Sequence, residues 1–136
     1  MQNPPPGPAG KSSTGLDENI AALLSYVFGW VSGLIFFLIE KDSKLVRFHA
    51  MQSILFNVAV AVVCIVLWIV TFILVLIASQ LAGALGSLVG LLATLFWVVV
   101  SIALLLAWIL CLVRAYQGQF YKLPVIGNMA DKIVNK

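Results

Sequence analysis

The sequence predicts an all-α integral membrane helical bundle with three transmembrane helices, or four, and a C-terminal amphipathic surface helix. Of its 136 residues, 62% are hydrophobic and only 10% are charged, and the mean hydropathy is +1.11. Soluble domains carry roughly 25% charged residues. Asp, Glu, Lys, Arg and His are all absent from Ala50 to Val113. A helix needs about 20 apolar residues to cross a bilayer, so this stretch exceeds one crossing.

The N-terminal part of the chain divides into a tail and a first span. Residues 1–15 are rich in Pro, Gly and Ser, which predicts a disordered tail, and the membrane domain then occupies 16–136. Residues 20–39 are uncharged and predict the first transmembrane helix. Glu40, Lys41 and Asp42 end it.

The long uncharged run holds two long helices or three short ones. Gly83, Gly86 and Gly90 cluster within residues 78–90, which favours a single break there and spans at about 49–78 and 88–113. Three short helices would need a second turn near Val70 and Thr71, where Gly, Pro, Asn and Asp are all lacking.

The distribution of basic residues predicts the orientation. With three spans, the first loop and the C-terminal tail share a face that carries seven of the eight Lys and Arg residues, against Lys11 on the other. The positive-inside rule then predicts a multi-pass protein of the cell (inner or plasma) membrane, with its N-terminus outside and its C-terminus in the cytoplasm. Four spans would place the two basic segments on opposite faces.

The C-terminal tail predicts a short amphipathic helix over about 124–135. Pro124 suits a first helical turn, while Met129 and Ile133 share one face and Asp131 and Lys132 lie opposite. Such a helix lies on the membrane surface or docks back on the bundle.

Small residues recur at intervals of four in the first predicted span and around the predicted break. Because they let helix backbones approach closely, they are predicted helix-packing positions, either in a homodimer face or within the bundle itself. They are Ser25, Gly29, Gly33, Gly86 and Gly90.

A polar stripe begins the second predicted span. His49, Ser53 and Asn57 follow one another at intervals of four, with Gln52 beside them. Two interpretations remain open. The stripe is either a cytoplasm-facing pocket for a headgroup, an ion or a partner peptide, or a helix start whose polar groups bond to other helices and to interfacial water.

Three-span topology brings the first loop and the segment after the last span to one membrane face. We therefore predict one cationic site there, with an anionic lipid headgroup or an acidic partner segment as its ligand. Its predicted residues are Lys44, Arg47, His49, Gln52, Asn57, Arg114, Tyr121 and Lys122.

Catalytic and metal-binding patterns are not evident in the sequence. A nucleophile or base with an orienting partner cannot be read from it. Cys64 and Cys111 fall in separate spans without further ligands nearby. We therefore expect no enzymatic activity, no catalytic residue, no metal, no cofactor and no nucleic-acid partner.

Two motifs carry a family resemblance: "KDSKLVRFHAMQSILFN" after the first span and "RAYQGQFYKLP" after the last. Between Leu16 and Ile133 the chain resembles small bacterial and archaeal membrane proteins of unknown function related to the Tic-twenty component of chloroplast import, a group that includes magnetosome membrane protein F. The family pattern maps onto Arg47, Phe48, His49, Gln52, Tyr116, Gly118, Tyr121 and Pro124. The plastid relatives have four spans, and the resemblance implies an architecture more than an activity.

Three function classes follow. The first is a non-enzymatic scaffold or assembly factor that binds anionic lipid or partner proteins at its cytoplasmic face, as a homo-oligomer or within a larger membrane complex. The second is a subunit of a protein-import or other conducting complex, as the plastid resemblance implies. The third is an enzyme acting on lipid.

Overall fold

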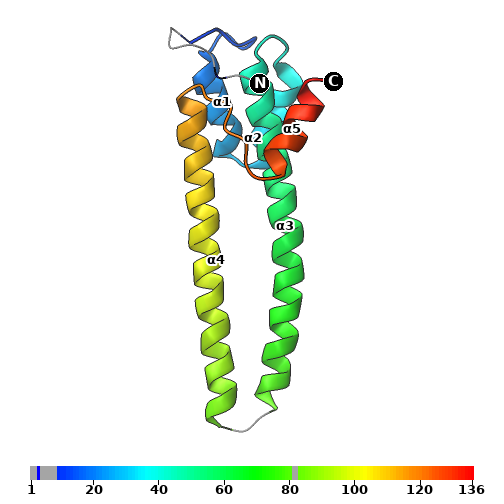
Figure 1. The fold of residues 1–136 in the computed structure, drawn as a ribbon, viewed down its shortest axis with the longest axis vertical. Coiled ribbons are helices and arrows are strands. Elements are labelled where there is room, and N and C mark those ends of the chain that lie inside the picture. Colours follow the sequence, from blue (N-terminus) through cyan, green and yellow to red (C-terminus); the bar gives the residue numbers. More distant parts are fainter. Residues whose placement is uncertain (1–2, 4–8, 81–82) are drawn as a thin grey trace. The chain divides into compact units, whose positions relative to one another are not determined.

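The chain is all-α, as the sequence predicted. The structure is a computed structural model that describes residues 3, 9–80 and 83–136. These residues form α1 (Glu18–Val27), α2 (Trp30–Ile39), α3 (Lys44–Ser79), α4 (Ala84–Tyr116) and α5 (Ile126–Val134) (Figure 1). They fall into two compact units: unit 1 comprises Met1–Ala59 and Trp108–Lys136, and unit 2 comprises Val60–Ala107.

Unit 2 contains the membrane-length part of the protein. Within the described residues, α3 and α4 are the two helices long and apolar enough to cross a bilayer, with best-window mean hydropathies of 3.3 and 2.8. Of the two alternatives for the uncharged run, two long helices or three short ones, the structure has two long helices. The hydroxyls of Thr71, Thr94 and Ser101 donate to carbonyls of their own helices, at 2.7–2.9 Å. Such internal bonding is what a lipid environment requires of polar groups.

The break between the long helices lies where the glycines predicted it. The α3 helix ends at Ser79 and α4 begins at Ala84. Leu81 and Ala82, which fall in the predicted break, lie outside the described residues.

The predicted first span, residues 20–39, is wrong as a single helix. It is divided into α1 and α2, each of 10 residues, or about 15 Å long, half the roughly 30 Å of a hydrocarbon core. The chain turns at Phe28 and Gly29, where Gly29 adopts φ 61°, a conformation that glycine reaches without steric cost. The Gly29 N–H donates to the Tyr26 carbonyl at 3.1 Å and closes the turn.

The N-terminal segment contacts the loop after α2, contrary to two predictions. Residues 9–15 were expected in a disordered tail, yet the Ser13 hydroxyl and amide donate to the Glu40 carboxylate at 2.8 and 3.1 Å. The Ser13 hydroxyl also lies 2.8 Å from Asp42 Oδ2. Segments in hydrogen-bond contact cannot lie on opposite faces of a membrane. The contact therefore does not fit the predicted placement of the N-terminus and the first loop on opposite faces.

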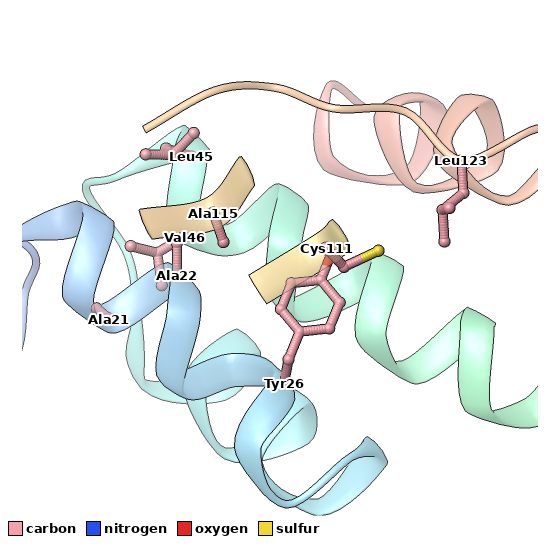
Figure 2. Packing of buried hydrophobic residues seen from close by; sticks show 8 residues of the cluster. All are labelled: Ala21, Ala22, Tyr26, Leu45, Val46, Cys111, Ala115 and Leu123. Carbon is pink, nitrogen blue, oxygen red and sulfur yellow. The ribbon is translucent and has the colours of Figure 1, made fainter. Parts of the chain in front are cut away.

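A small apolar cluster holds the helices of unit 1 together (Figure 2). Alanines on α1 and α4 keep the facing helix surfaces flat, so the backbones can approach closely. Tyr26 projects from α1 toward Cys111 of α4. The buried members are Ala21, Ala22, Tyr26, Leu45, Val46, Cys111, Ala115 and Leu123.

The C-terminal helix packs within unit 1 through two small residues. Gly127 and Ala130 of α5 are buried. An added Cβ on Gly127 would lie 2.5 Å from Lys122 Cα and 2.8 Å from Gln52 Oε1. The sequence left open whether α5 lies on the membrane surface or packs on the bundle. The face with Gly127 and Ala130 packs on the bundle, while Met129 and Ile133 are exposed.

Candidate functional site

The two sequence motifs meet in a buried polar network at the start of α3. His49 Nε2 lies 2.8 Å from the Gln119 carbonyl oxygen. A carbonyl can only accept, so Nε2 carries a proton. His49 Nδ1 lies 3.0 Å from the Tyr26 hydroxyl. If that hydroxyl donates to Nδ1, every group of this chain of contacts has a suitable partner.

Gln52 joins the same network to the segment after α4. Its side-chain amide donates to the Tyr26 hydroxyl and to the Tyr121 carbonyl, both at 3.0 Å. Its Oε1 accepts from the Leu123 amide at 3.2 Å. His49, Gln52 and Tyr26 are all 0% exposed. The network therefore ties α1, α3 and residues 119–123 together.

The deeper part of the polar stripe faces the turn between α1 and α2. The Ser53 hydroxyl donates to the Gly29 carbonyl at 3.0 Å, and the Asn57 amide donates to the Ser53 carbonyl at 2.8 Å. Gly29 also approaches Asn57, since an added Cβ would lie 3.0 Å from Asn57 Oδ1. These contacts match the interpretation of the stripe as a helix start bonded to other helices.

The predicted cationic residues differ in whether their charged groups are bonded to other parts of the chain. Lys44 is exposed. Arg47 donates to the Glu40 carbonyl at 2.8 Å and lies 4.6 Å above the Phe37 ring. Arg114 donates to Gln119 Oε1 at 2.7 Å and lies 5.6 Å above the Tyr121 ring.

Lys122, the remaining predicted cation, forms an ion pair with Asp131 of α5. The hydrogen bond from Lys122 holds the pKa of Asp131 below its usual range. The charge of Lys122 is therefore paired within the chain, because α5 folds back beside it.

Glu40, which the sequence placed at the end of the first predicted span, is a buried acid. Its side chain is fully buried. Burial alone would raise its pKa, but hydrogen bonds from the Ser43, Ser13 and Asp42 amides and the Ser13 hydroxyl outweigh that effect and lower the pKa. Ser13 lies 27 residues from Glu40, and the sequence offers no signal for such a pairing.

Tyr26 and Trp108 are the other members that sequence reasoning missed. Trp108 Nε1 donates to the Tyr26 carbonyl at 3.0 Å, and this bond connects α4 to α1. A tyrosine inside an apolar run was the available signal, because its hydroxyl needs a partner once buried.

The predicted helix-packing residues are divided between the units. Gly33 of α2 packs on α3, since an added Cβ would lie 2.9 Å from the Ala50 carbonyl oxygen. Ser25 donates to the Ala21 carbonyl within α1. The turn at Gly29 prevents Ser25, Gly29 and Gly33 from forming one continuous strip. In unit 2, Gly90 lines an open groove of about 610 Å³, and Gly86 lies one turn before it in α4.

The chain matches the sequence profile of the magnetosome magnetite crystal formation protein family over residues 16–130. It belongs to this family. The matched range contains α1 to α4, both sequence motifs and the polar network. The predicted resemblance to magnetosome membrane proteins is therefore confirmed at the level of the family.

Archaeal relatives extend the comparison. A UPF0132 membrane protein of Methanocaldococcus jannaschii is 40% identical, covering 90% of this chain and 94% of the relative. A second one from that organism is 31% identical, covering 87% and 71%. A UPF0132 membrane protein of Archaeoglobus fulgidus is 34% identical, covering 86% and 95%. No solved structure matches the chain. The relatives' names and the two membrane-length helices identify an integral membrane protein.

Proposed function

We propose that this protein is a non-enzymatic membrane scaffold or assembly factor that binds anionic lipid headgroups or partner proteins at its cytoplasmic face. One observation supports this most directly. All eight Lys and Arg residues and all five Asp and Glu residues belong to unit 1, and unit 2 carries no formal charge. Unit 2 is thus suited to hydrocarbon, and unit 1 to a membrane surface.

The same distribution supports an orientation that differs from the sequence-based one. If α3 and α4 are the crossings, then the N-terminal segment, the loop 40–43 and the C-terminal tail share one membrane face. All eight basic residues then lie on that face. By the positive-inside rule it is the cytoplasmic face of the inner or plasma membrane.

Two exposed lysines, one in the loop before α3 and one at its first residue, are the proposed contact with anionic ligands. Lys41 and Lys44 are both exposed, and Arg47 is held beside them by Glu40 and Phe37. Each base near an anionic leaflet contributes on the order of 1 kcal/mol. His49 and Gln52 would support this surface from below by fixing the helix, since both are buried.

The family description concerns magnetite crystal formation, which raises the question of iron. Each acid of this chain has a partner within hydrogen-bond distance, and the single hydroxyl proton of Ser13 serves either Glu40 or Asp42. Asp17 pairs with Lys11, Glu18 with Ser43, Glu40 and Asp42 with Ser13, and Asp131 with Lys122. We therefore propose a role in organising the membrane or other proteins, rather than in binding iron directly.

Lipid retention tests the proposal. The double variant Lys41→Gln/Lys44→Gln is compared with Lys132→Gln/Lys136→Gln, which removes the same charge from exposed positions of the tail. We expect the first to lower phosphatidylglycerol retention in native mass spectrometry about 30-fold and the second much less, because two bases contribute about 2 kcal/mol. Equal retention by both variants, or no preference for phosphatidylglycerol over phosphatidylcholine, contradicts the proposal.

A second candidate function follows from the likeness to the Tic-twenty component: a subunit of a protein-import or other conducting complex. Purification from native membranes in mild detergent separates the two. A stoichiometric complex with channel activity in planar bilayers would favour the conducting subunit. Lipid turnover abolished by His49→Ala would instead favour an enzyme, which we do not expect because His49 is enclosed by Tyr26 and Gln119.

A further inference from the structure

The turn between α1 and α2 presents large apolar side chains outward. Phe28 is 77% exposed, Trp30 55%, Val31 42% and Val27 40%. The chain carries no charged residue between Glu18 and Glu40. Removal of such large apolar side chains from water is favourable, so four of them together call for an apolar partner. We call these four residues the hairpin tip.

Backbone polar groups of the hairpin tip are hydrogen-bonded within the protein, as a medium without water requires. The Phe28 amide donates to the Ser32 hydroxyl at 3.0 Å, and the Gly29 amide donates to the Tyr26 carbonyl at 3.1 Å. The Gly29 carbonyl accepts from Ser53 at 3.0 Å. In hydrocarbon each unsatisfied backbone group costs several kcal/mol. A turn facing water would not need serines from α2 and α3 for this purpose.

The contacts of Gly29 fix the level of the tip along α3. Gly29 lies against Ser53 and Asn57. After Asn57, α3 is mostly exposed and apolar as far as Ile77. The roughly 22 residues from Val58 to Ser79 rise about 33 Å, close to the thickness of a hydrocarbon core. Asn57 thus marks one boundary of that core, and the tip lies beside it.

We propose that the hairpin tip inserts into the bilayer at this boundary, with Phe28 and Trp30 among the upper acyl-chain segments of the leaflet nearest unit 1. Its partner is the lipid acyl chain just below the headgroup. Tryptophan suits this depth because its ring is apolar and its N–H can reach the polar layer. The inference does not depend on binding of anionic headgroups, since Val27, Phe28, Trp30 and Val31 carry no charge.

Fluorescence quenching by brominated lipids measures the depth directly. Two single-tryptophan proteins are reconstituted in phosphatidylcholine: one keeps Trp30 and the other Trp68, with the remaining tryptophans replaced by Phe. Trp68 lies about 15 Å beyond Val58 along α3. We expect Trp30 to be quenched most strongly by bromines near the headgroup, and Trp68 by bromines near the chain ends. Absence of quenching at Trp30, or maximal quenching by the deepest bromines, overturns the proposal.

A second measurement covers the case in which Trp108→Phe disturbs the fold, since Trp108 bonds to Tyr26. A nitroxide is attached at Phe28→Cys or, as a control, at Thr14→Cys, with both native cysteines replaced by Ala. We expect the label at position 28 to be more accessible to oxygen than to a water-soluble nickel complex, and the label at position 14 to show the reverse. Equal behaviour of the two labels overturns the proposal.

Discussion

At the scale of single residues, Gln52 joins α3 to α1 and to the segment after α4. It bonds to Tyr26, Tyr121 and Leu123, and a side chain without an amide would remove the partner of the Tyr121 carbonyl and the Leu123 amide. An unsatisfied buried donor or acceptor costs about 1–3 kcal/mol. We expect Gln52→Met to lower the free energy of unfolding by about that amount, measured in detergent by circular dichroism.

The matched control for Gln52 is Gln80→Met. Gln80 is exposed, and among the described residues its side chain bonds only to its neighbour Ser79, so we expect a change within about 0.5 kcal/mol. Equal effects of the two substitutions would show that the network contributes nothing specific. Protection of the Leu123 amide from hydrogen exchange, lost in Gln52→Met alone, would locate the effect.

Glu40 makes the stability of unit 1 sensitive to acid. Its pKa is lowered in the folded chain, so the folded state favours the carboxylate. The resulting stabilisation is present above the unfolded value of about 4.3 and is lost as the pH falls through the lower folded value. We expect the difference in melting temperature between the wild type and Glu40→Gln to shrink as the pH falls from about 6 to 3. A difference independent of pH would contradict this role, because other acids titrate equally in both proteins.

At the scale of helices, the contact between α2 and α3 depends on a residue without a side chain. A Cβ on Gly33 would lie 2.9 Å from the Ala50 carbonyl and 3.2 Å from Ser53 Cβ, which forces the helices apart. We expect Gly33→Ala to destabilise the protein by about 1–3 kcal/mol, as overpacking does. Thermal unfolding in detergent measures it.

Gly90→Ala is the helical control for Gly33→Ala. An added Cβ on Gly90 has nothing within 4 Å. Alanine is the better helix former by up to about 1 kcal/mol, so we expect no loss of stability or a small gain. If Gly90→Ala lost as much stability as Gly33→Ala, the effect at Gly33 would not come from its contact with α3.

The helices also show what the sequence could predict. The absence of charge from Ala50 to Val113 identified the apolar segment, and the glycines between Ser79 and Gly90 located its break. Residues 20–39 misled because composition does not distinguish one long helix from two short ones. The difference lies in the φ angle of Gly29 and its contact with Asn57, a residue 28 positions away.

The candidate site shows a similar limit. The spacing of His49, Ser53 and Asn57 correctly placed them on one helix, but spacing gives no partner. The partners of His49 are Tyr26 and Gln119, and the partner of Ser53 is Gly29. The Gln119 and Gly29 groups are backbone carbonyls. Carbonyls are present at every residue, so no pattern in the sequence could single them out.

At the scale of the whole molecule, charge and hydrogen bonding lead to the same topology. The Ser13–Glu40 contact joins the N-terminal segment to the first loop, and Asn19 donates to the Tyr116 carbonyl at the end of α4 at 3.1 Å. These contacts join the starts of α1 and α3 to the end of α4 within unit 1. They support the proposal that all three lie on one side of the membrane.

Cysteine labelling in intact cells tests this topology. Single cysteines replace Thr14, Lys41, Gln80 or Lys136, all exposed, in a protein whose Cys64 and Cys111 are Ala. We expect a membrane-impermeant maleimide to label position 80 at once, because that position faces outward. Positions 14, 41 and 136 should label only after the membrane is permeabilised, because the eight basic residues keep their face in the cytoplasm. Labelling of position 14 in intact cells while position 41 stays protected would restore three spans with an outside N-terminus, and the Ser13–Glu40 contact would then have to be absent from the membrane-embedded protein.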